Sequence, residues 1–146
     1  MLIFKRGDIF KSKADVLVNP VNCVGVMGKG LAAQFKKTFP HVFEEYVKLC
    51  EREILIPGKP YYCSSLFPPS VVFFPTKGHW RAKSKLTDIE KGLKNLRKNL
   101  IKWKVASIAI PALGCGLGGL NWKHDVRPLI EKYYSDTLIV VEVFEP

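Results

Sequence analysis

A glycine-bearing segment between an apolar run and a helical pattern constrains the fold of this chain most strongly. The apolar run 16–18 precedes Asn19–Gly30, and Leu31, Phe35 and Phe39 follow at four-residue spacing. This order predicts a strand, a loop and a helix. Such a loop lets backbone N–H groups approach a phosphate, and the N-terminus of the helix favours negative charge. The alternative is a strand-to-helix turn that merely needs glycine.

A second segment has the same character. Pro111–Leu120 follows the apolar run 105–110 and contains four glycines within six residues. The polar and basic stretch Thr76–Ser84 also follows an apolar run. Because the carboxyl ends of parallel strands meet at one edge of a sheet, we expect all three segments to reach one site.

Apolar runs alternate with helical periodicities along the whole chain. The sequence predicts strands at 2–4, 14–18, 60–65, 71–74, 105–110 and 137–144, and helices at 31–39, 42–50, 86–103 and about 125–134. Thr87 and Glu90 have the spacing of a capping box at the start of the third helix. The alternation predicts an α/β fold around a mostly parallel sheet.

The composition indicates a globular protein with a basic surface. The chain has 146 residues, of which 47% are hydrophobic, and no apolar run reaches the ~18 residues of a membrane span. We expect one domain over residues 1–146, a monomer, in the cytoplasm and without membrane contact. The net charge of +10 suits a polyanionic partner such as nucleic acid, or belongs to a solvated surface.

The four cysteines suggest neither a disulfide nor a metal site. Cys23, Cys50, Cys63 and Cys115 contain no C-x-x-C pair, and no histidine stands at a ligand spacing from them. We therefore expect reduced thiols and no metal. Cys23 and Cys115 fall in the two glycine loops, where small packing residues are favoured over catalysts.

Motifs distributed over the whole chain resemble those of the macrodomain superfamily. They are Gly7-Asp8-Ile9, Asn19–Asn22, Gly25–Gly30, Phe74–Arg81 and Pro111–Trp122. Within the superfamily the chain is most similar to the macrodomains of DarG antitoxins, which remove ADP-ribose from thymidine in DNA. The resemblance implies a single macrodomain, a three-layer α/β/α sandwich around a central mixed, mostly parallel sheet.

The resemblance also implies an ADP-ribose site. Asp8 would accept a hydrogen bond from the adenine amino group, or is a plain turn residue. Asn22 would face the distal ribose, whereas Asn19 braces the loop. The other residues expected to bind ADP-ribose are Ile9, Gly28, Gly30, Leu31, Thr76, Gly114, Cys115, Gly116, Leu117, Gly118 and Gly119.

Lys77 is the catalytic candidate that the resemblance indicates. A related protein glycohydrolase uses a lysine at the anomeric carbon of the distal ribose; otherwise Lys77 would only pair with a phosphate. That relative also has an aspartate where this chain has Gly118, which leaves the acid–base partner open. His79 is one candidate for it, with a packing role as the alternative, and a bound water or a DNA phosphate is another.

Trp80, Arg81 and Lys83 form the candidate DNA-binding segment. An aromatic ring beside basic side chains is a common way to hold single-stranded nucleic acid. The alternative for Trp80 is packing against the edge of the sheet.

The function we expect is a DNA ADP-ribosyl glycohydrolase that acts on thymidine in single-stranded DNA and needs no cofactor. Its partners would be ADP-ribose, ADP-ribosylated single-stranded DNA and a DarT-type toxin. One alternative is hydrolysis of ADP-ribosyl esters on protein glutamate or aspartate, or of O-acetyl-ADP-ribose. Another is a non-catalytic module that binds ADP-ribose.

Overall fold

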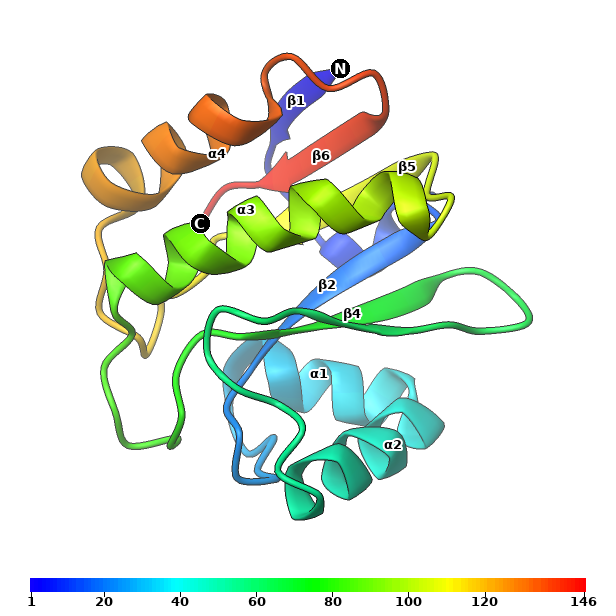
Figure 1. The fold of residues 1–146 in the computed structure, drawn as a ribbon, viewed down its shortest axis with the longest axis vertical. Coiled ribbons are helices and arrows are strands. Elements are labelled where there is room, and N and C mark those ends of the chain that lie inside the picture. The colour runs from blue at the N-terminus through cyan, green and yellow to red at the C-terminus, as the bar shows by residue number, and fades with distance from the viewer.

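The structure, a computed structural model, describes residues 1–146, and a six-stranded sheet forms its centre (Figure 1). The strands are β1 (Leu2–Lys5), β2 (Val16–Val21), β3 (Tyr61–Cys63), β4 (Ser70–Pro75), β5 (Ser107–Pro111) and β6 (Val140–Phe144). Their order across the sheet is β1-β6-β5-β2-β4-β3. Only β3 pairs antiparallel, with β4, so the predicted mixed and mostly parallel sheet is confirmed.

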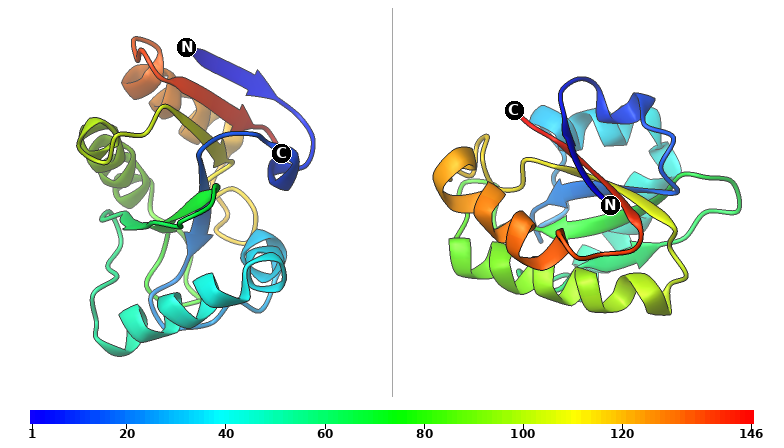
Figure 2. Two further views of the ribbon diagram at one scale, coloured as in Figure 1. Left: turned by 90° about the vertical axis from the view of Figure 1, so that its right-hand side faces the viewer. Right: turned by 90° about the horizontal axis from the view of Figure 1, so that it is seen from above.

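Helices cover both faces of the sheet and complete the predicted three-layer sandwich (Figure 2). Helices α1 (Gly30–Thr38) and α2 (Pro40–Glu51) lie on one face, and α3 (Leu86–Lys102) and α4 (Arg127–Tyr134) lie on the other. Two short helical turns, η1 (Ile9–Lys11) and η2 (Trp122–Val126), follow β1 and β5.

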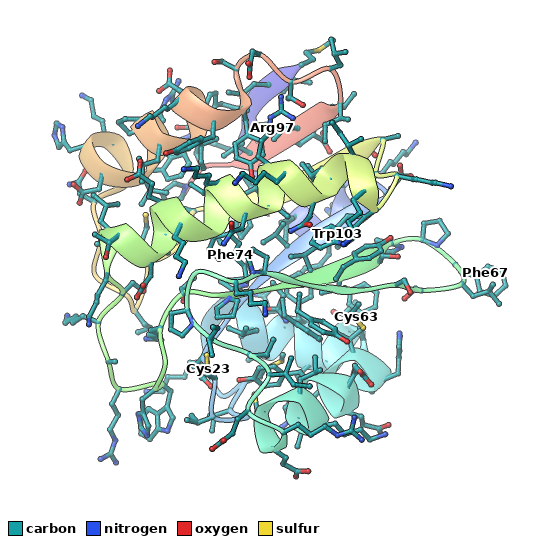
Figure 3. The ribbon with its side chains drawn as sticks, viewed as in Figure 1. Cys23, Cys63, Phe67, Phe74, Arg97 and Trp103 are labelled. Carbon is teal, nitrogen blue, oxygen red and sulfur yellow. The ribbon has the colours of Figure 1, made fainter.

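The two cores follow from the alternation of side chains along the central strands. Val16 and Val18 of β2 face α3 and α4, whereas Leu17 faces α1 and α2. A strand buried on both faces reads as a continuous apolar run, which is why β2 and β4 were recognisable in the sequence. Phe74 of β4 lies under α3, where Gly92 leaves space for its ring (Figure 3).

The sheet opens between β2 and β5 toward their carboxyl ends. β2 pairs with β4 over all six of its residues, but with β5 only through Val16 and Leu17. β2 also runs to Val21, beyond the predicted end at Val18, so that Asn19 and Pro20 are strand residues rather than loop residues. The first loop therefore starts at Asn22, directly beside this opening.

The predicted capping box at the start of α3 is wrong. Lys85 is the N-cap residue, and no side chain caps the helix. Glu90 instead accepts a hydrogen bond from the Tyr133 hydroxyl at 2.9 Å and lies 3.5 Å from the Lys132 amine. A contact with α4 thus replaces the local contact that the spacing suggested.

None of the helices combines the length and the apolar character that a bilayer-spanning segment requires.

Candidate functional site

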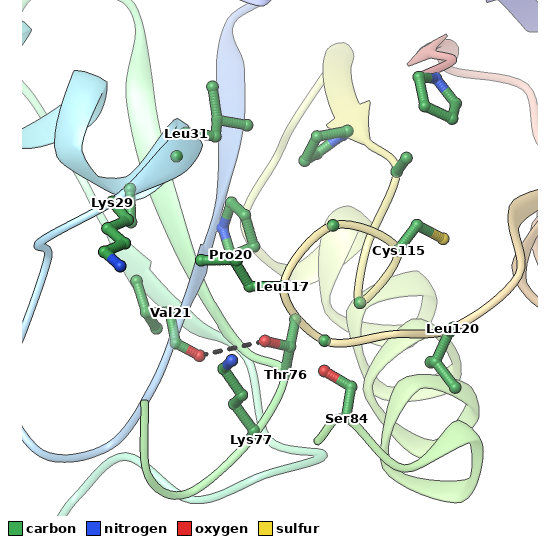
Figure 4. Close-up of a pocket in the computed structure, with 18 of the residues that line it drawn as sticks. Pro20, Val21, Lys29, Leu31, Thr76, Lys77, Ser84, Cys115, Leu117 and Leu120 are labelled. Atoms are coloured by element: carbon green, nitrogen blue, oxygen red, sulfur yellow. Dashed lines mark hydrogen bonds between the residues drawn. The ribbon is translucent and has the colours of Figure 1, made fainter. Parts of the chain in front are cut away.

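A cavity of about 1370 Å³ opens at the carboxyl edge of the parallel strands (Figure 4). Its walls come from the segments that follow β1, β2, β4, β5 and β6. Of the expected site residues, those that line it are Asp8, Ile9, Asn22, Gly28, Gly30, Leu31, Thr76, Lys77, Trp80, Arg81, Gly114, Cys115, Gly116, Leu117 and Gly118. His79, Lys83 and Gly119 do not line it.

Asp8 stands at one end of this cavity. One oxygen of its carboxylate accepts a hydrogen bond from the Phe10 N–H at 2.9 Å and caps η1, which leaves the second oxygen free. The turn η1, which begins just after Asp8, packs against β5 and α1, whereas Thr76 and Lys77 follow β4, on the other side of β2 in the sheet. The cavity is therefore elongated across the strands and suits an extended ligand.

The first glycine loop is braced by the side chain of Asn22. The Asn22 amide donates to the Val26 carbonyl at 2.8 Å, and its oxygen accepts from the Val24 N–H at 3.0 Å and from the Tyr46 hydroxyl at 2.7 Å. The oxygen of Asn22 is thus fully used. Only one amide N–H remains for a ligand, and Tyr46 fixes the direction in which it points.

We expect Tyr46→Phe to weaken ADP-ribose binding by about tenfold, because the Tyr46 hydroxyl contacts both the side-chain oxygen and the carbonyl of Asn22, and its loss loosens the loop there. Titration calorimetry with ADP-ribose measures this effect. Tyr134→Phe is the matched control, since Tyr134 is equally buried and donates to the Leu93 carbonyl at 2.7 Å, between α4 and α3. An equal loss of affinity in both variants would contradict a role through Asn22.

The second glycine loop presents backbone rather than side chains to the cavity. Gly114 has a φ of +73°, a conformation that residues with a side chain rarely adopt. Gly118 is buried, and a Cβ placed there would lie 2.6 Å from the Gly114 carbonyl oxygen and in contact with the Ser84 hydroxyl. Consecutive N–H groups in such a loop form a concave site for an anion.

The N-terminus of α1 faces the same cavity. Gly30 and Leu31 line it, and no side chain caps the first turn of α1. The free N–H groups and the helix dipole together favour an anionic ligand. Two backbone sites for anions thus lie on opposite walls, as a diphosphate requires.

Lys77 projects into the cavity beside Thr76 (Figure 4). It is half-buried, and no carboxylate lies within ion-pair distance of it. Burial, together with the neighbouring charge of Lys83, lowers the pKa of the Lys77 amine. The segment is also tied to the first loop, because the Cys23 N–H donates to the Gly78 carbonyl at 2.9 Å. Lys77 is thus held as an unpaired amine whose proton is easier to remove than usual.

His79 does not line the cavity that Lys77 enters. We expected the two side chains to share one face of an extended backbone, but β4 ends at Pro75 and the chain then turns, with the Ala82 N–H donating to the His79 carbonyl. The His79 ring accepts from the Arg81 N–H at 3.1 Å and stacks on Trp80 with 5.3 Å between ring centroids. The ring of His79 thus contacts loop residues outside the residues that line the cavity.

Trp80 and Arg81 form an exposed rim at the mouth of the cavity. The guanidinium of Arg81 lies 4.5 Å from the centroid of the Trp80 ring, and Trp80 is 44% exposed. Trp80 is stacked between loop residues at the surface rather than packed against the sheet edge. Lys83 lies behind this rim, where a Cβ on Gly119 would touch its side chain.

The two loop cysteines are poor nucleophiles. Burial raises the pKa of the Cys23 thiol to about 11, and burial likewise raises the pKa of the Cys115 thiol to about 11. Both thiols stay protonated at neutral pH, which agrees with the packing role expected for them. No three His, Cys, Asp or Glu side chains gather closely enough to hold a metal ion.

The fold and the cavity together define an α/β domain in which two backbone loops suited to an anion line one cavity. The chain belongs to the Macro domain family, whose model matches residues 18–128. The resemblance to macrodomains in the sequence is thereby confirmed.

Particular members of the family are similar to this chain over its whole length. The macrodomain of Thermus aquaticus DarG has 42% sequence identity and a TM-score of 0.93, with 100% of this chain and 99% of that chain covered. Thermosipho africanus DarTG in complex with ADP-ribose has 38% identity and a TM-score of 0.95, covering 99% of this chain and 41% of that one.

A curated relative from Mycobacterium tuberculosis is named DNA ADP-ribosyl glycohydrolase. It is 41% identical over 149 aligned residues, which cover 100% of this chain and 42% of the relative. The chain thus spans about two fifths of the length of this relative.

Proposed function

We propose that this chain hydrolyses the N-glycosidic bond between ADP-ribose and a thymine base in single-stranded DNA. The observation that carries the proposal is the Lys77 amine, which is half-buried, unpaired and of lowered pKa beside two backbone anion sites. The name of the M. tuberculosis relative supports the reaction, and the DarTG complex with ADP-ribose supports the ligand.

ADP-ribose would lie along the cavity from Asp8 to Lys77. The free carboxylate oxygen of Asp8 accepts from the adenine amino group, and the diphosphate takes N–H donors from the second glycine loop and from the N-terminus of α1. The distal ribose then lies between the remaining N–H of Asn22 and the Lys77 amine. Each role uses a group that the folded chain leaves free.

Lys77 acts as the nucleophile in this proposal. Its neutral amine attacks the anomeric carbon of the distal ribose, the carbon–nitrogen bond to thymine breaks, and the electron pair leaves with the base nitrogen, which takes up a proton. Opening of the sugar ring gives an imine between Lys77 and the ribose. Water hydrolyses the imine, releases ADP-ribose and restores the lysine.

The rim of Trp80 and Arg81 would hold the DNA strand, with Lys83 adding positive charge behind it. Stacking of bases on an aromatic ring and pairing of phosphates with cations tolerate many sequences. The net charge of +10 adds to the attraction. In this role the chain would remove the ADP-ribosyl group that a DarT-type toxin attaches to DNA. It would act in the cytoplasm, where its DNA substrate lies.

A time course with wild-type protein tests the proposal. The substrates are a single-stranded oligonucleotide ADP-ribosylated on thymidine and, in parallel, a protein ADP-ribosylated on glutamate. We expect release of ADP-ribose from DNA. Release from the protein alone would assign the chain to the ester hydrolases. Binding of ADP-ribose without release from either substrate would make the chain a non-catalytic module that binds ADP-ribose.

The pH dependence of cleavage reports the state of Lys77. Burial lowers the pKa of the Lys77 amine, and the charge of Lys83 lowers it further because it disfavours the protonated form. Lys83→Gln removes this charge, so we expect the rise of the cleavage rate with pH to move to higher pH. Single-turnover rates across pH measure the shift, with Lys85→Gln as the control. An unchanged profile would argue against a neutral Lys77 in the reaction.

A further inference from the structure

The hydroxyl of Ser84 is buried and has no hydrogen-bond partner. Ser84 is 7% exposed, and its Oγ is one of two buried side-chain polar atoms in the molecule that lack a partner. Buried polar groups are almost always hydrogen-bonded, because leaving one unpaired costs free energy. A buried and unpaired hydroxyl therefore needs an explanation.

The position of Ser84 is fixed by the second glycine loop. Its N–H donates to the Gly118 carbonyl at 3.0 Å, and a Cβ on Gly114 would lie 3.2 Å from the Cβ of Ser84. The absence of a side chain on Gly118 leaves the space that the Ser84 hydroxyl occupies. The loop and Ser84 thus pack as one unit.

The hydroxyl is not used to stabilise the neighbouring structure. Lys85, not Ser84, is the N-cap residue of α3, and no side chain caps that helix. Thr76, the other hydroxyl residue that lines the cavity, donates its own hydroxyl to the Val21 carbonyl (Figure 4). No internal acceptor is therefore satisfied by Ser84.

The hydroxyl is directed into the cavity. Ser84 lines it, and Figure 4 shows the Ser84 oxygen pointing toward Thr76 and Lys77. No hydrogen bond joins Ser84 to Lys77, so a ligand group placed between them could contact both. The two residues come from opposite ends of the segment 77–84 and meet at the same end of the site.

We propose that the Ser84 hydroxyl contacts the distal ribose of the ADP-ribosyl group and holds its anomeric carbon toward Lys77. This inference rests on the proposed function, because it takes the sugar beside Lys77 to be the one that reacts. A serine hydroxyl donates and accepts, as a ribose hydroxyl does, so one pair of hydroxyls satisfies both. The diphosphate needs only donors, and the glycine loop supplies those from its backbone.

Calorimetric titration of wild type and Ser84→Ala with ADP-ribose and with ADP, which lacks the distal ribose, tests the proposal. We expect Ser84→Ala to weaken ADP-ribose binding by about tenfold, the value of one hydrogen bond, and to leave ADP binding within about twofold. Equal weakening for both ligands would overturn the contact with the ribose. Unchanged binding of both would overturn any contact with the ligand.

Thermal unfolding separates this role from a structural one. Ser84→Ala removes an unpaired hydroxyl, so we expect an unchanged or higher midpoint. Ser70→Ala is the matched control, because Ser70 is equally buried but accepts from the Ser65 N–H at 2.9 Å, at the other end of β4. The control should unfold at lower temperature and bind ADP-ribose normally. If Ser84→Ala is as destabilised as the control, the hydroxyl has a structural partner and the inference fails.

The proposed function can fail separately. If wild-type protein binds ADP-ribose and Ser84→Ala shows the selective loss, but the DNA time course gives no release, the sugar contact stands and the reaction does not. If wild-type protein does not bind ADP-ribose, both proposals fall together.

Discussion

Replacing Lys77 by alanine should abolish the release of ADP-ribose from DNA while leaving ADP-ribose bound. We expect the rate to fall by at least about 1,000-fold, because loss of the nucleophile removes the covalent route altogether. The affinity should change by no more than a few fold, because the loop backbones and Asp8 supply most of the contacts. Single-turnover cleavage and calorimetry on the same preparation measure the two quantities.

Two further variants separate a nucleophile from a simple positive charge. Lys77→Arg keeps the charge but cannot lose its proton, so it should restore phosphate pairing and not cleavage. Lys29→Ala removes another lysine that lines the same cavity, at the N-cap of α1, and should retain the rate. Substantial cleavage by Lys77→Arg would show that Lys77 acts through charge alone.

Gly118→Ala should weaken the affinity for ADP-ribose by more than tenfold. It should also lower the free energy of unfolding by about 1–3 kcal/mol, because the added methyl group overpacks a close contact. The added Cβ would press on the Gly114 carbonyl oxygen at 2.6 Å and on the Ser84 hydroxyl. The backbone carbonyl cannot move without changing the loop that holds the anion. Denaturant unfolding and calorimetry measure the two effects.

Gly116→Ala is the control for stability on the same loop. A Cβ at Gly116 would meet no atom of the protein within 4 Å. Its free energy of unfolding should therefore stay within about 0.5 kcal/mol of wild type. If Gly118→Ala were as stable as this control and bound ADP-ribose normally, the close packing of the loop would have no role in binding.

The same contact bears on position 118, where the resemblance to a protein glycohydrolase implies an aspartate and this chain has glycine. In this structure the position has no room even for a methyl group, and the hydroxyl of Ser84 fills the adjacent space. A carboxylate cannot be added at position 118 without rebuilding the loop. The acid–base partner of Lys77 therefore does not come from this position.

The sequence by itself predicted the elements whose signals are local. Buried parallel strands read as apolar runs, and the stripe of Ile89, Leu93, Leu96 and Leu100 identified α3. Glycine-rich segments after strands indicated the two loops that line the cavity, and the motifs along the chain led to the macrodomain family. Lys77 became a candidate through its motif, because nothing in its local sequence distinguishes it from a surface lysine, and the structure shows that it lines the cavity.

Local patterns misled where a contact from elsewhere in the chain replaced the expected one. Glu90 has the spacing to cap α3, but its carboxylate instead accepts a hydrogen bond from Tyr133 and pairs with Lys132, both of α4. His79 is two residues from Lys77, but the turn after β4 directs its ring toward Trp80. His79 lies in the loop between β4 and α3, where the backbone is not regular, and Glu90 lies in the second turn of α3, within reach of α4.

The tertiary structure alone decided which polar groups are free to bind a ligand. Tyr46 on α2 occupies the oxygen of Asn22, and burial, together with the charge of Lys83, lowers the pKa of Lys77. Ser84 gave no signal in the sequence, because a serine reads the same whether it is exposed or buried. Its unpaired hydroxyl exists only because the bare backbone of Gly118, thirty-four residues away in the sequence, packs against it. Burial and hydrogen-bond satisfaction are properties of packed surfaces, and they form only when distant segments meet.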